Sequence, residues 1–467
     1  MLQPSPFDVA IIGGGVVGCA VARHLTLAGA KVVLLEKATD ILSGASKGNS
    51  AILHTGFDAP PDSLELACMQ EGYQEYIDIR TRLRLPILET GAVVVAWTDD
   101  EIGRLDQIEQ TARDNGISDV RRLDRNALQA REPHLSADAL GSLLVPREHL
   151  IDPWSAPLAY LLQALANGAE IRRSTELLSG QFDGRGWRLS TSTGELAATT
   201  VVNCAGLYGD IVDERLTGQT HFTIKPRKGQ FVVFDKAAAR LLGTIILPIP
   251  SERTKGIVLT PTIFGNLLVG PTAEEQDERD RAEVDMATLE SLKQKAEAIL
   301  PALAGMPVTA IYAGLRPATE RKEYRVRHDT ERHLITIGGI RSTGLTAALG
   351  LARHVGRLWA SGHTHSPIAD PAWPAVPMLA EHEDRDWTRP GYGEIICHCE
   401  MVTRREIEAA LDGPLPAGDI GGLKRRTRAG MGCCQGFNCS ARLASLTEGR
   451  FPVPLAVGHC HDRAGHD

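Results

Sequence analysis

From its start to about residue 365, the chain alternates short runs of valine, isoleucine and leucine with segments of helical spacing. Phe7–Ile12 and Lys31–Glu36 have the apolar character of buried strands, and a helical pattern lies between them. Parallel strands need such intervening segments, because each chain reversal requires a crossover. The pattern therefore predicts an α/β protein with parallel strands.

The apolar texture changes at Ser366. Between 366 and 393, prolines recur among acidic residues, which predicts an extended linker with little core of its own. Five cysteines follow within residues 394–448, and the chain ends in a histidine-containing tail over 449–467 with Cys460. We therefore expect a large first domain, a linker, a small cysteine-rich domain and a frayed tail.

Composition narrows the class of protein. Apolar residues make up 43% and charged residues 23% of the 467 residues, which is ordinary for a globular protein. The net charge of -8 argues against general nucleic-acid binding. No stretch approaches the ~20 apolar residues of a membrane helix, and the N-terminus lacks a basic signal-peptide region. We expect a cytoplasmic protein with no membrane span, docked at most through a partner, and without a disulfide framework.

The loop after the first predicted strand carries G-x-G-x-x-G. Gly13 suits the tight turn, Gly15 the close approach of a pyrophosphate, and Gly18 the packing of the following helix on the strand. The start of that helix attracts the pyrophosphate, and Glu36 at the end of the second strand can bind ribose hydroxyls. This predicts a dinucleotide site. The acid disfavours a 2′-phosphate and leaves FAD and NAD open.

The cysteines of the small domain have the spacing of a metal site. Cys397 and Cys399 form one pair, and Cys433, Cys434 and Cys439 follow a predicted helix whose capping box is Thr403–Glu406. Thiolates this close can share a soft metal. Spacing alone leaves a zinc site and an iron-sulfur site equally open.

Residues 7 to 360 contain several segments that resemble the D-amino-acid oxidase superfamily, in family order. The segments are 43–56, 201–206 and 337–346, and they are similar to its glycerol-3-phosphate dehydrogenase and L-2-hydroxyglutarate oxidase branches. The resemblance implies FAD as the cofactor. It also implies a set of cofactor-binding residues, namely Gly13, Gly15, Gly18, Glu36, Lys37, Ser46, Asn49, Ser50, Ala205, Gly206, Gly344, Leu345 and Thr346.

The same resemblance implies an interleaved architecture. A Rossmann-type FAD-binding domain would come from about 1–85, 145–225 and 330–365, and an α+β substrate domain with a mostly antiparallel sheet from about 86–145 and 226–329. The short strand-like runs at 229–235, 256–260 and 266–270 are compatible with that sheet.

Two residues are candidates for chemistry on an alcohol substrate. His54 lies in the segment that the resemblance places beside the flavin, and an imidazole suits proton acceptance near neutral pH. It could instead be a structural histidine or a covalent flavin link. Arg316, in Gly314-Leu315-Arg316-Pro317, matches a family arginine whose fork grips an anionic group. Arg341 and Lys228 are weaker candidates for that clamp.

The cysteine domain resembles the bacterioferritin-associated-ferredoxin-like 2Fe-2S domain. Carried over position by position, the ligands are Cys397, Cys399, Cys434 and Cys439, and Cys433 is a bystander or an alternative ligand. The basic residues at 424–428 would either stabilise the anionic cluster or steer an acidic partner.

Together the two resemblances imply an FAD-dependent dehydrogenase of a small anionic hydroxy compound that passes electrons through a 2Fe-2S cluster to an external acceptor. Glycerol 3-phosphate is the leading substrate, and L-2-hydroxyglutarate, another 2-hydroxy acid, or an amine or amino acid are the alternatives. The acceptor would be a protein or a second flavoprotein subunit. The chain could also be a scaffold subunit without turnover of its own, or carry a zinc module that only docks partners.

Overall fold

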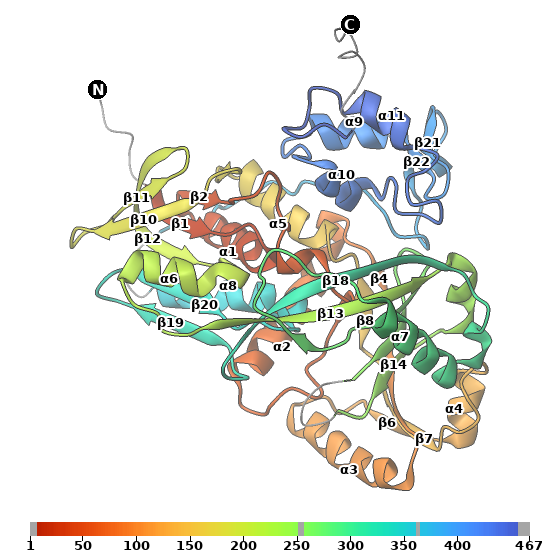
Figure 1. Cartoon of the computed structure of the whole chain (residues 1–467). Helices are drawn as coiled ribbons and strands as arrows, with labels where there is room; N and C mark the ends of the chain where they lie inside the picture. The colour runs from red at the N-terminus through yellow and green to blue at the C-terminus, as the bar shows by residue number, and fades with distance from the viewer. Residues whose placement is uncertain (1–6, 251–255, 361–364, 456–467) are drawn as a thin grey trace, which may run out of the picture. The chain divides into compact units, whose positions relative to one another are not determined.

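The structure, a computed structural model, describes residues 7–250, 256–360 and 365–455, and these fall into two compact units (Figure 1). Unit 1 ends at Glu383 and unit 2 begins at Asp384. The part of the tail that holds Cys460 lies outside the described residues. Within the described ranges, no helix is both long and apolar enough to cross a membrane.

The first sheet of unit 1 has eight strands and a parallel centre. Its strands are β1 (Phe7–Ile12), β2 (Val32–Leu35), β9 (Glu170–Arg172), β10 (Leu177–Phe182), β11 (Trp187–Thr191), β12 (Gly194–Asn203), β19 (Arg325–Asp329) and β20 (Leu334–Gly338). The order is β10-β11-β12-β1-β2-β9, with β20 also on β12 and β19 on β20. Strands β9, β2, β1, β12 and β20 are parallel, as the sequence predicts for the nucleotide-binding layer.

Helices cover both faces of this sheet. They are α1 (Val16–Leu27), α2 (Leu64–Leu83), α5 (Ser155–Ala166), α6 (Gly209–Thr217) and α8 (Gly344–Ala360). Ala10 and Ile12 share a core with Val212 and Leu216 of α6, so the alternate side chains of β1 point to the opposite face. There α1 packs beside α5 and α8, and α8 packs beside α2. The parallel strands are therefore buried on both sides.

The second sheet of unit 1 has nine strands and is almost entirely antiparallel. Its strands are β5 (Ala92–Ala96), β6 (Arg121–Asp124), β7 (Gly141–Val145), β13 (Ile224–Phe234), β14 (Ile245–Pro248), β15 (Val258–Pro261), β16 (Leu267–Gly270), β17 (Glu274–Glu275) and β18 (Val308–Thr319). Only β5 and β14 pair in parallel. These strands come from two stretches that interrupt the first sheet, so the interleaved α+β architecture predicted from the resemblance is confirmed.

Side chains point alternately to the two faces along each strand, so a separate hydrophobic core lies on each face of this sheet. Val93 and Val95 pack into one core, whereas Ala92, Val94 and Ala96 pack into the other. The first core also takes residues of α4 (Arg125–Arg131) and α7 (Met286–Ile299), and the second takes residues of α3 (Asp99–Asp114). Three shorter strands, β3 (Ile52–Leu53), β4 (Ile87–Leu88) and β8 (His149–Ile151), form a separate small sheet.

The beginning of the predicted linker packs against unit 1. Residues 365–383 belong to that unit, and Met378, Leu379 and Ala380 are buried with Ile263 and Phe264. The prolines keep this stretch out of regular helices and strands, while the few apolar side chains between them still bury surface. The extended character predicted from composition is therefore compatible with a packed segment.

Unit 2 has a small core of its own. Its elements are β21 (Ile395–Cys397), β22 (Val402–Thr403), α9 (Arg404–Asp412), α10 (Ile420–Thr427) and α11 (Ser440–Leu446). Thr403 accepts a hydrogen bond from the Glu406 amide, and the Glu406 carboxylate accepts one from Thr403 N, which confirms the predicted capping box. Ile396, Val402 and Leu423 are buried around it.

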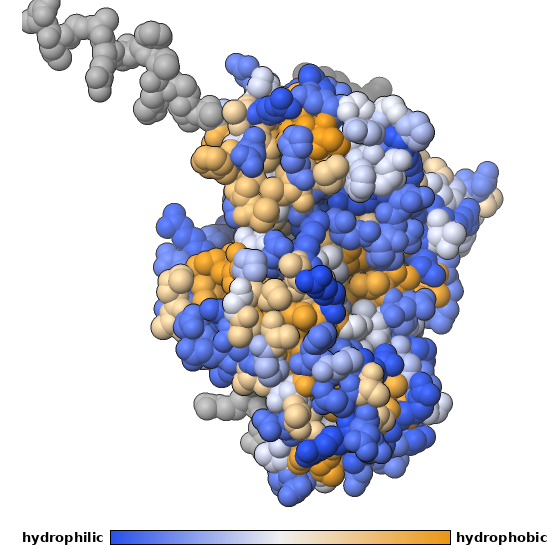
Figure 2. Space-filling model, turned by 90° about the vertical axis from the view of Figure 1, so that its right-hand side faces the viewer, coloured by the Kyte–Doolittle hydropathy of each residue, from blue (hydrophilic) through white to orange (hydrophobic). Residues whose placement is uncertain are grey.

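The surface is mixed in character. On the face that Figure 2 shows, apolar side chains form patches of limited size that hydrophilic residues interrupt. Phe437 is the most exposed large apolar side chain of the described residues, at 89%. It lies in the loop between Cys434 and Cys439.

Candidate functional site

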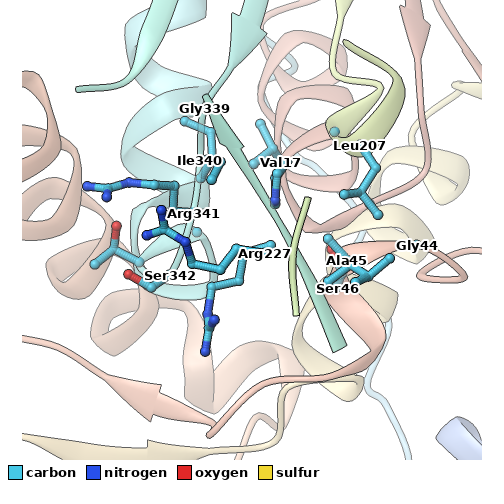
Figure 3. Close-up of a pocket in the computed structure, with 18 of the residues that line it drawn as sticks. Val17, Gly44, Ala45, Ser46, Leu207, Arg227, Gly339, Ile340, Arg341 and Ser342 are labelled. Atoms are coloured by element: carbon cyan, nitrogen blue, oxygen red, sulfur yellow. The ribbon is translucent and has the colours of Figure 1, made fainter. Parts of the chain in front are cut away.

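A large cavity in unit 1 collects residues from both sheets. Its volume is about 1660 Å³, which exceeds the ~300–1,000 Å³ usual for one small ligand. Figure 3 shows Gly44, Ala45 and Ser46 on one side, and Arg227 and Arg341 on another. The cavity has room for a dinucleotide and a small substrate together.

The glycine-rich loop lies at one end of the cavity, where α1 begins. A Cβ on Gly13 would lie 2.6 Å from the carbonyl oxygen of Cys204, and one on Gly18 would lie 1.9 Å from that of Gly13. At Gly15, which is also the N-cap of α1, the nearest atom would be Ser46 Oγ at 3.3 Å. Gly13 and Gly18 therefore close the turn, whereas Gly15 leaves backbone amides open to an anionic ligand.

We expect Gly18→Ala to weaken FAD binding by about tenfold or more, because the added methyl group displaces the loop that approaches the pyrophosphate. The measurement is the FAD dissociation constant of the reconstituted apoprotein. Gly44→Ala is a matched control: Gly44 also lines the cavity, but its Cβ would meet nothing within 4 Å. Equal affinities of the two variants would contradict the assigned role of Gly18.

Glu36 supports the glycine loop in addition to facing the cavity. Its Oε2 accepts a hydrogen bond from Gly14 N at 2.7 Å and its Oε1 accepts one from Ala38 N at 2.8 Å. Burial raises the pKa of this carboxyl group, and the two amides oppose that shift. Each carboxylate oxygen keeps a further lone pair with which a ribose hydroxyl can be bound.

Most of the other predicted cofactor residues line the same cavity. Ser46 Oγ accepts a hydrogen bond from Val16 N at 3.0 Å and so ties the segment after β2 to the start of α1. Lys37 Nζ lies 3.3 Å from the ring centre of Tyr208. The remaining cavity-lining members of the predicted set are Asn49, Ser50, Ala205, Gly206, Gly344 and Leu345. Thr346 does not line the cavity, since its hydroxyl is bonded to His54 N and Ile52 O.

His54 lines the cavity and has a buried acidic neighbour. Its Nδ1 lies 2.7 Å from Oε2 of Glu148, whose side chain is fully buried. Thr55 donates to the other carboxylate oxygen from its amide at 2.5 Å and from its hydroxyl at 2.7 Å. An imidazole held at Nδ1 by a carboxylate leaves Nε2 for proton exchange with a ligand.

Three arginines surround another part of the cavity. Arg227 of β13 and Arg316 of β18 are directly opposite each other in the antiparallel ladder, and Arg341 follows β20. Burial first, and then the charges of Arg227 and Arg341, lower the pKa of Arg316 to about 10. Like charges directly opposite across strands are destabilising. This arrangement therefore suits a site that an anion neutralises.

The guanidinium group of Arg316 occupies space that a side chain at position 229 would fill, so its position requires Gly229. Its Nη2 donates to the Thr272 carbonyl at 3.1 Å, and a Cβ on Gly229 would lie 2.7 Å from the same Nη2. The other weak clamp candidate, Lys228, is ion-paired with Glu274 at 3.0 Å and does not line the cavity.

Several polar residues at the site were not predicted from the sequence. Glu148 and Arg227 are the first two. Tyr324, Thr343 and Glu65 form a third group, in which the tyrosine and threonine hydroxyls lie 2.6 Å apart and Thr343 donates to Glu65 at 2.7 Å. Their partners lie far away in sequence, so no local pattern identifies them. The local sequence around Arg227 offers one sign of an anion site, the basic residues at positions 225, 227 and 228 just before Gly229.

The cysteines of unit 2 gather around two loops. Cys397 and Cys439 are buried, Cys399 and Cys434 are half-buried, and Cys433 is exposed. The thiol of Cys439 interacts with those of Cys397 and Cys434, and the thiol of Cys399 interacts with those of Cys433 and Cys434. A hydrogen bond from the Asn438 amide lowers the pKa of the Cys434 thiol. The Sγ of Cys433 lies 3.5 Å from that of Cys399.

The four predicted ligands, Cys397, Cys399, Cys434 and Cys439, have thiols that neighbour one another. Four neighbouring thiols suit a two-iron cluster held by four cysteines. A Cβ on Gly432 would lie 2.3 Å from that of Cys399, so the loop needs a glycine there to approach the first pair.

The basic residues near the cysteines have different surroundings. Arg428 and Glu400 form an ion pair at 2.8 Å, with side chains that are 5% and 1% exposed. This pair joins the residue after Cys399 to the loop before Cys433. The contact gives Arg428 a bracing role in the cluster loop besides any effect of its charge on the cluster.

Comparison with protein-family models gives one match for each unit. Residues 8–358 match the model described as FAD dependent oxidoreductase, and residues 395–448 match the BFD-like [2Fe-2S] binding domain. The glycine loop fits FAD, and the four neighbouring cysteines fit a 2Fe-2S cluster.

Individual proteins agree with the family models. A glycerol 3-phosphate dehydrogenase of Caloramator mitchellensis is 31% identical, with 96% of this chain and 95% of that protein covered. One component of the anaerobic glycerol-3-phosphate dehydrogenase of Escherichia coli K12 is 26% identical, over 96% of this chain and 89% of its own. The FAD-bound L-alpha-glycerophosphate oxidase of Mycoplasma pneumoniae superimposes with a TM-score of 0.75 at 25% identity, over 80% of this chain and 100% of its own.

Proposed function

We propose that this chain, which belongs to the FAD-dependent oxidoreductase family and carries a C-terminal BFD-like [2Fe-2S] domain, is a dehydrogenase that converts glycerol 3-phosphate to dihydroxyacetone phosphate. The observation that best supports this substrate is the cross-strand pair of Arg227 and Arg316. Arg316 lies directly opposite Arg227, which is paired with Glu275 at 2.6 Å, and Arg341 adds to the positive charge around Arg316. A phosphate, with up to two negative charges on three oxygens, matches that better than a single carboxylate.

The named relatives support the same substrate. The proteins from Caloramator and Escherichia coli are both named as glycerol 3-phosphate dehydrogenases, and both match along nearly the whole chain. Since that length includes the cysteine unit, the support extends to the combination of the two domains as well as to the FAD-binding fold.

The residues of the cavity have separate tasks in this proposal. Arg316, with Arg227 and Arg341, binds the phosphate and fixes the substrate's orientation. His54 accepts the proton of the hydroxyl group that is oxidised. Bound FAD supplies hydride acceptance and the 2Fe-2S cluster supplies single-electron transfer. The second sheet roofs the cavity, which limits the access of water to the site.

Anaerobic bleaching of the flavin absorbance tests the substrate. We expect glycerol 3-phosphate to bleach the purified protein and L-2-hydroxyglutarate or an amino acid to leave it oxidised. Bleaching by 2-hydroxyglutarate alone would replace our substrate with the 2-hydroxy acid. Iron and sulfide analysis of the same sample should give about two of each per chain.

We also propose a protein partner that receives the electrons. The Escherichia coli relative is named as one of the subunits of its enzyme, which supports an assembly with another protein chain. We also propose a cytoplasmic location. The described cysteines are all free thiols, and the cytoplasm is a reducing environment in which disulfides are rare. Turnover with an artificial acceptor that rises when the partner protein is added would support the proposed partner. Full turnover of the isolated chain with a soluble quinone would argue against a required partner.

A further inference from the structure

Glu148 is a buried acid that holds one side of the His54 ring. The small sheet positions the pair, because Leu53 of β3 is directly opposite His149 of β8 and the adjacent residues 54 and 148 are thereby neighbours. The Glu148 side chain has no exposed area. It binds His54 through Oε2 and Thr55 through Oε1. Both oxygens are thus committed to fixed neighbours.

The hydrogen-bond network assigns the proton between the acid and the imidazole. The Thr55 amide and hydroxyl both donate to Oε1, and donors of this kind stabilise the ionised carboxylate. Oε2 is therefore the acceptor, and His54 Nδ1 carries the hydrogen. In the neutral ring, Nε2 then keeps its lone pair. No other described residue is hydrogen-bonded to Nε2, and the ring lines the cavity.

We propose that Glu148 is a positioning residue that holds His54 in the tautomer with Nδ1–H and so keeps Nε2 as the proton acceptor. The inference rests on the proposed function, since it gives His54 that task. His54 N also donates to Thr346 Oγ1 at 3.0 Å, so both the ring and its backbone are held in place. This role requires only the hydrogen bond between Glu148 and His54. It requires no contact between Glu148 and the substrate.

Glu148→Gln separates this role from simple support. The amide oxygen of the new side chain must face the amide and hydroxyl of Thr55, because both of these groups are hydrogen-bond donors. An NH₂ group in that place would be a third donor and could form no hydrogen bond with them. The NH₂ group is therefore directed at Nδ1, which must become the acceptor. The ring is forced into the opposite tautomer, with hydrogen on Nε2 facing the cavity. The variant keeps shape and hydrogen-bond number but loses the proton acceptor.

The first measurement is the rate of flavin bleaching by glycerol 3-phosphate in a single turnover. We expect Glu148→Gln to lower this rate by about 10²- to 10⁴-fold, as for loss of a general base, and to leave the substrate dissociation constant within about threefold. His54→Asn should show a loss of similar size. A Glu148→Gln protein with the wild-type rate would overturn the inference.

The matched control is Asp213→Asn. Asp213 is fully buried, its Oδ2 lies 2.6 Å from His221 Nδ1, and neither residue lines the cavity. We expect this control to keep the wild-type rate in the folded, FAD-loaded fraction. An equal rate loss in both variants would reduce Glu148 to a general supporting residue.

A proton NMR spectrum tests the tautomer independently of the substrate. We expect a far-downfield Nδ1–H signal that disappears in both Glu148→Gln and His54→Asn but persists in Asp213→Asn. Absence of that signal from the wild-type protein would refute the proton assignment. If the signal behaves as expected and glycerol 3-phosphate bleaches nothing, the proposed substrate fails while the positioning of His54 stands.

Discussion

Replacing Arg316 with methionine is expected to lower kcat/KM for glycerol 3-phosphate by about 10²- to 10⁴-fold, mainly through a higher KM. Two charge-assisted hydrogen bonds to one phosphate contribute about 1.5–3 kcal/mol each, and each 1.4 kcal/mol corresponds to about tenfold. Methionine keeps much of the length of the side chain and removes the fork. The measurement is steady-state kinetics with an artificial electron acceptor, together with substrate titration of the oxidised flavin.

Two further variants make the Arg316 result specific. Arg316→Lys keeps the charge and loses the two-pronged geometry, so an intermediate loss is expected. Arg122→Met is the matched control, because Arg122 lies on β6 of the same sheet, pairs with Asp106 at 3.1 Å and does not line the cavity. An Arg316→Met protein with unchanged kinetics, or a loss as large in the Arg122 variant, would contradict a phosphate clamp.

Removing the anion site should also relieve a like-charge contact. Arg227 and Arg316 are cross-strand neighbours, and Arg227 is already paired with Glu275 at 2.6 Å. Glu275 thus offsets part of the repulsion between the two arginines in the folded protein.

The nucleotide-binding end of the cavity could be predicted from the sequence because its determinants are local. Strand, glycine loop, helix and second strand follow one another within residues 7–36, and close backbone contacts explain the glycines at positions 13 and 18. The capping box of α9 is equally local, since it joins Thr403 and Glu406. In such cases the residues that interact are also close in the chain.

The chemical end of the cavity could be predicted only in part. His54 and Arg316 were suggested by resemblance, but their partners depend on strand register. Glu148 reaches His54 across 94 positions in sequence, through the pairing of β3 with β8. Arg227 reaches Arg316 through the long ladder of β13 and β18. A shift of one residue would turn either side chain to the other face, and no composition or motif specifies that register.

The cysteine unit shows the same division. The spacing of the thiols indicated a metal site, but it left zinc and iron-sulfur open. The match of residues 395–448 to the BFD-like [2Fe-2S] binding domain selects the iron-sulfur alternative. The buried pair of Arg428 and Glu400 shows that one charge of the basic run acts inside the fold, which the run alone could not indicate.

Replacing Cys434 with serine is expected to abolish the 2Fe-2S cluster while the FAD remains bound. A serine oxygen is a much poorer ligand for iron of this kind than a thiolate, and a two-iron cluster needs all four of the predicted cysteines. Iron and sulfide content should fall from about two per chain to near zero. Anaerobic bleaching by glycerol 3-phosphate should persist, because the flavin lies in unit 1, whereas electron delivery to a one-electron protein acceptor should be lost.

Cys433→Ser is the matched control, and it tests which adjacent cysteine is the ligand. Cys433 is exposed and Cys434 half-buried, and a hydrogen bond from the Asn438 amide lowers the pKa of the Cys434 thiol. A thiol held by backbone amides inside the loop is better placed to be a fixed ligand. We therefore expect Cys433→Ser to keep its iron, sulfide and visible cluster spectrum. Cys433 Sγ lies only 3.5 Å from Cys399 Sγ, so Cys433 is also close enough to another predicted ligand to bind the cluster in place of Cys434. Cluster loss in Cys433→Ser with retention in Cys434→Ser would exchange the two assignments.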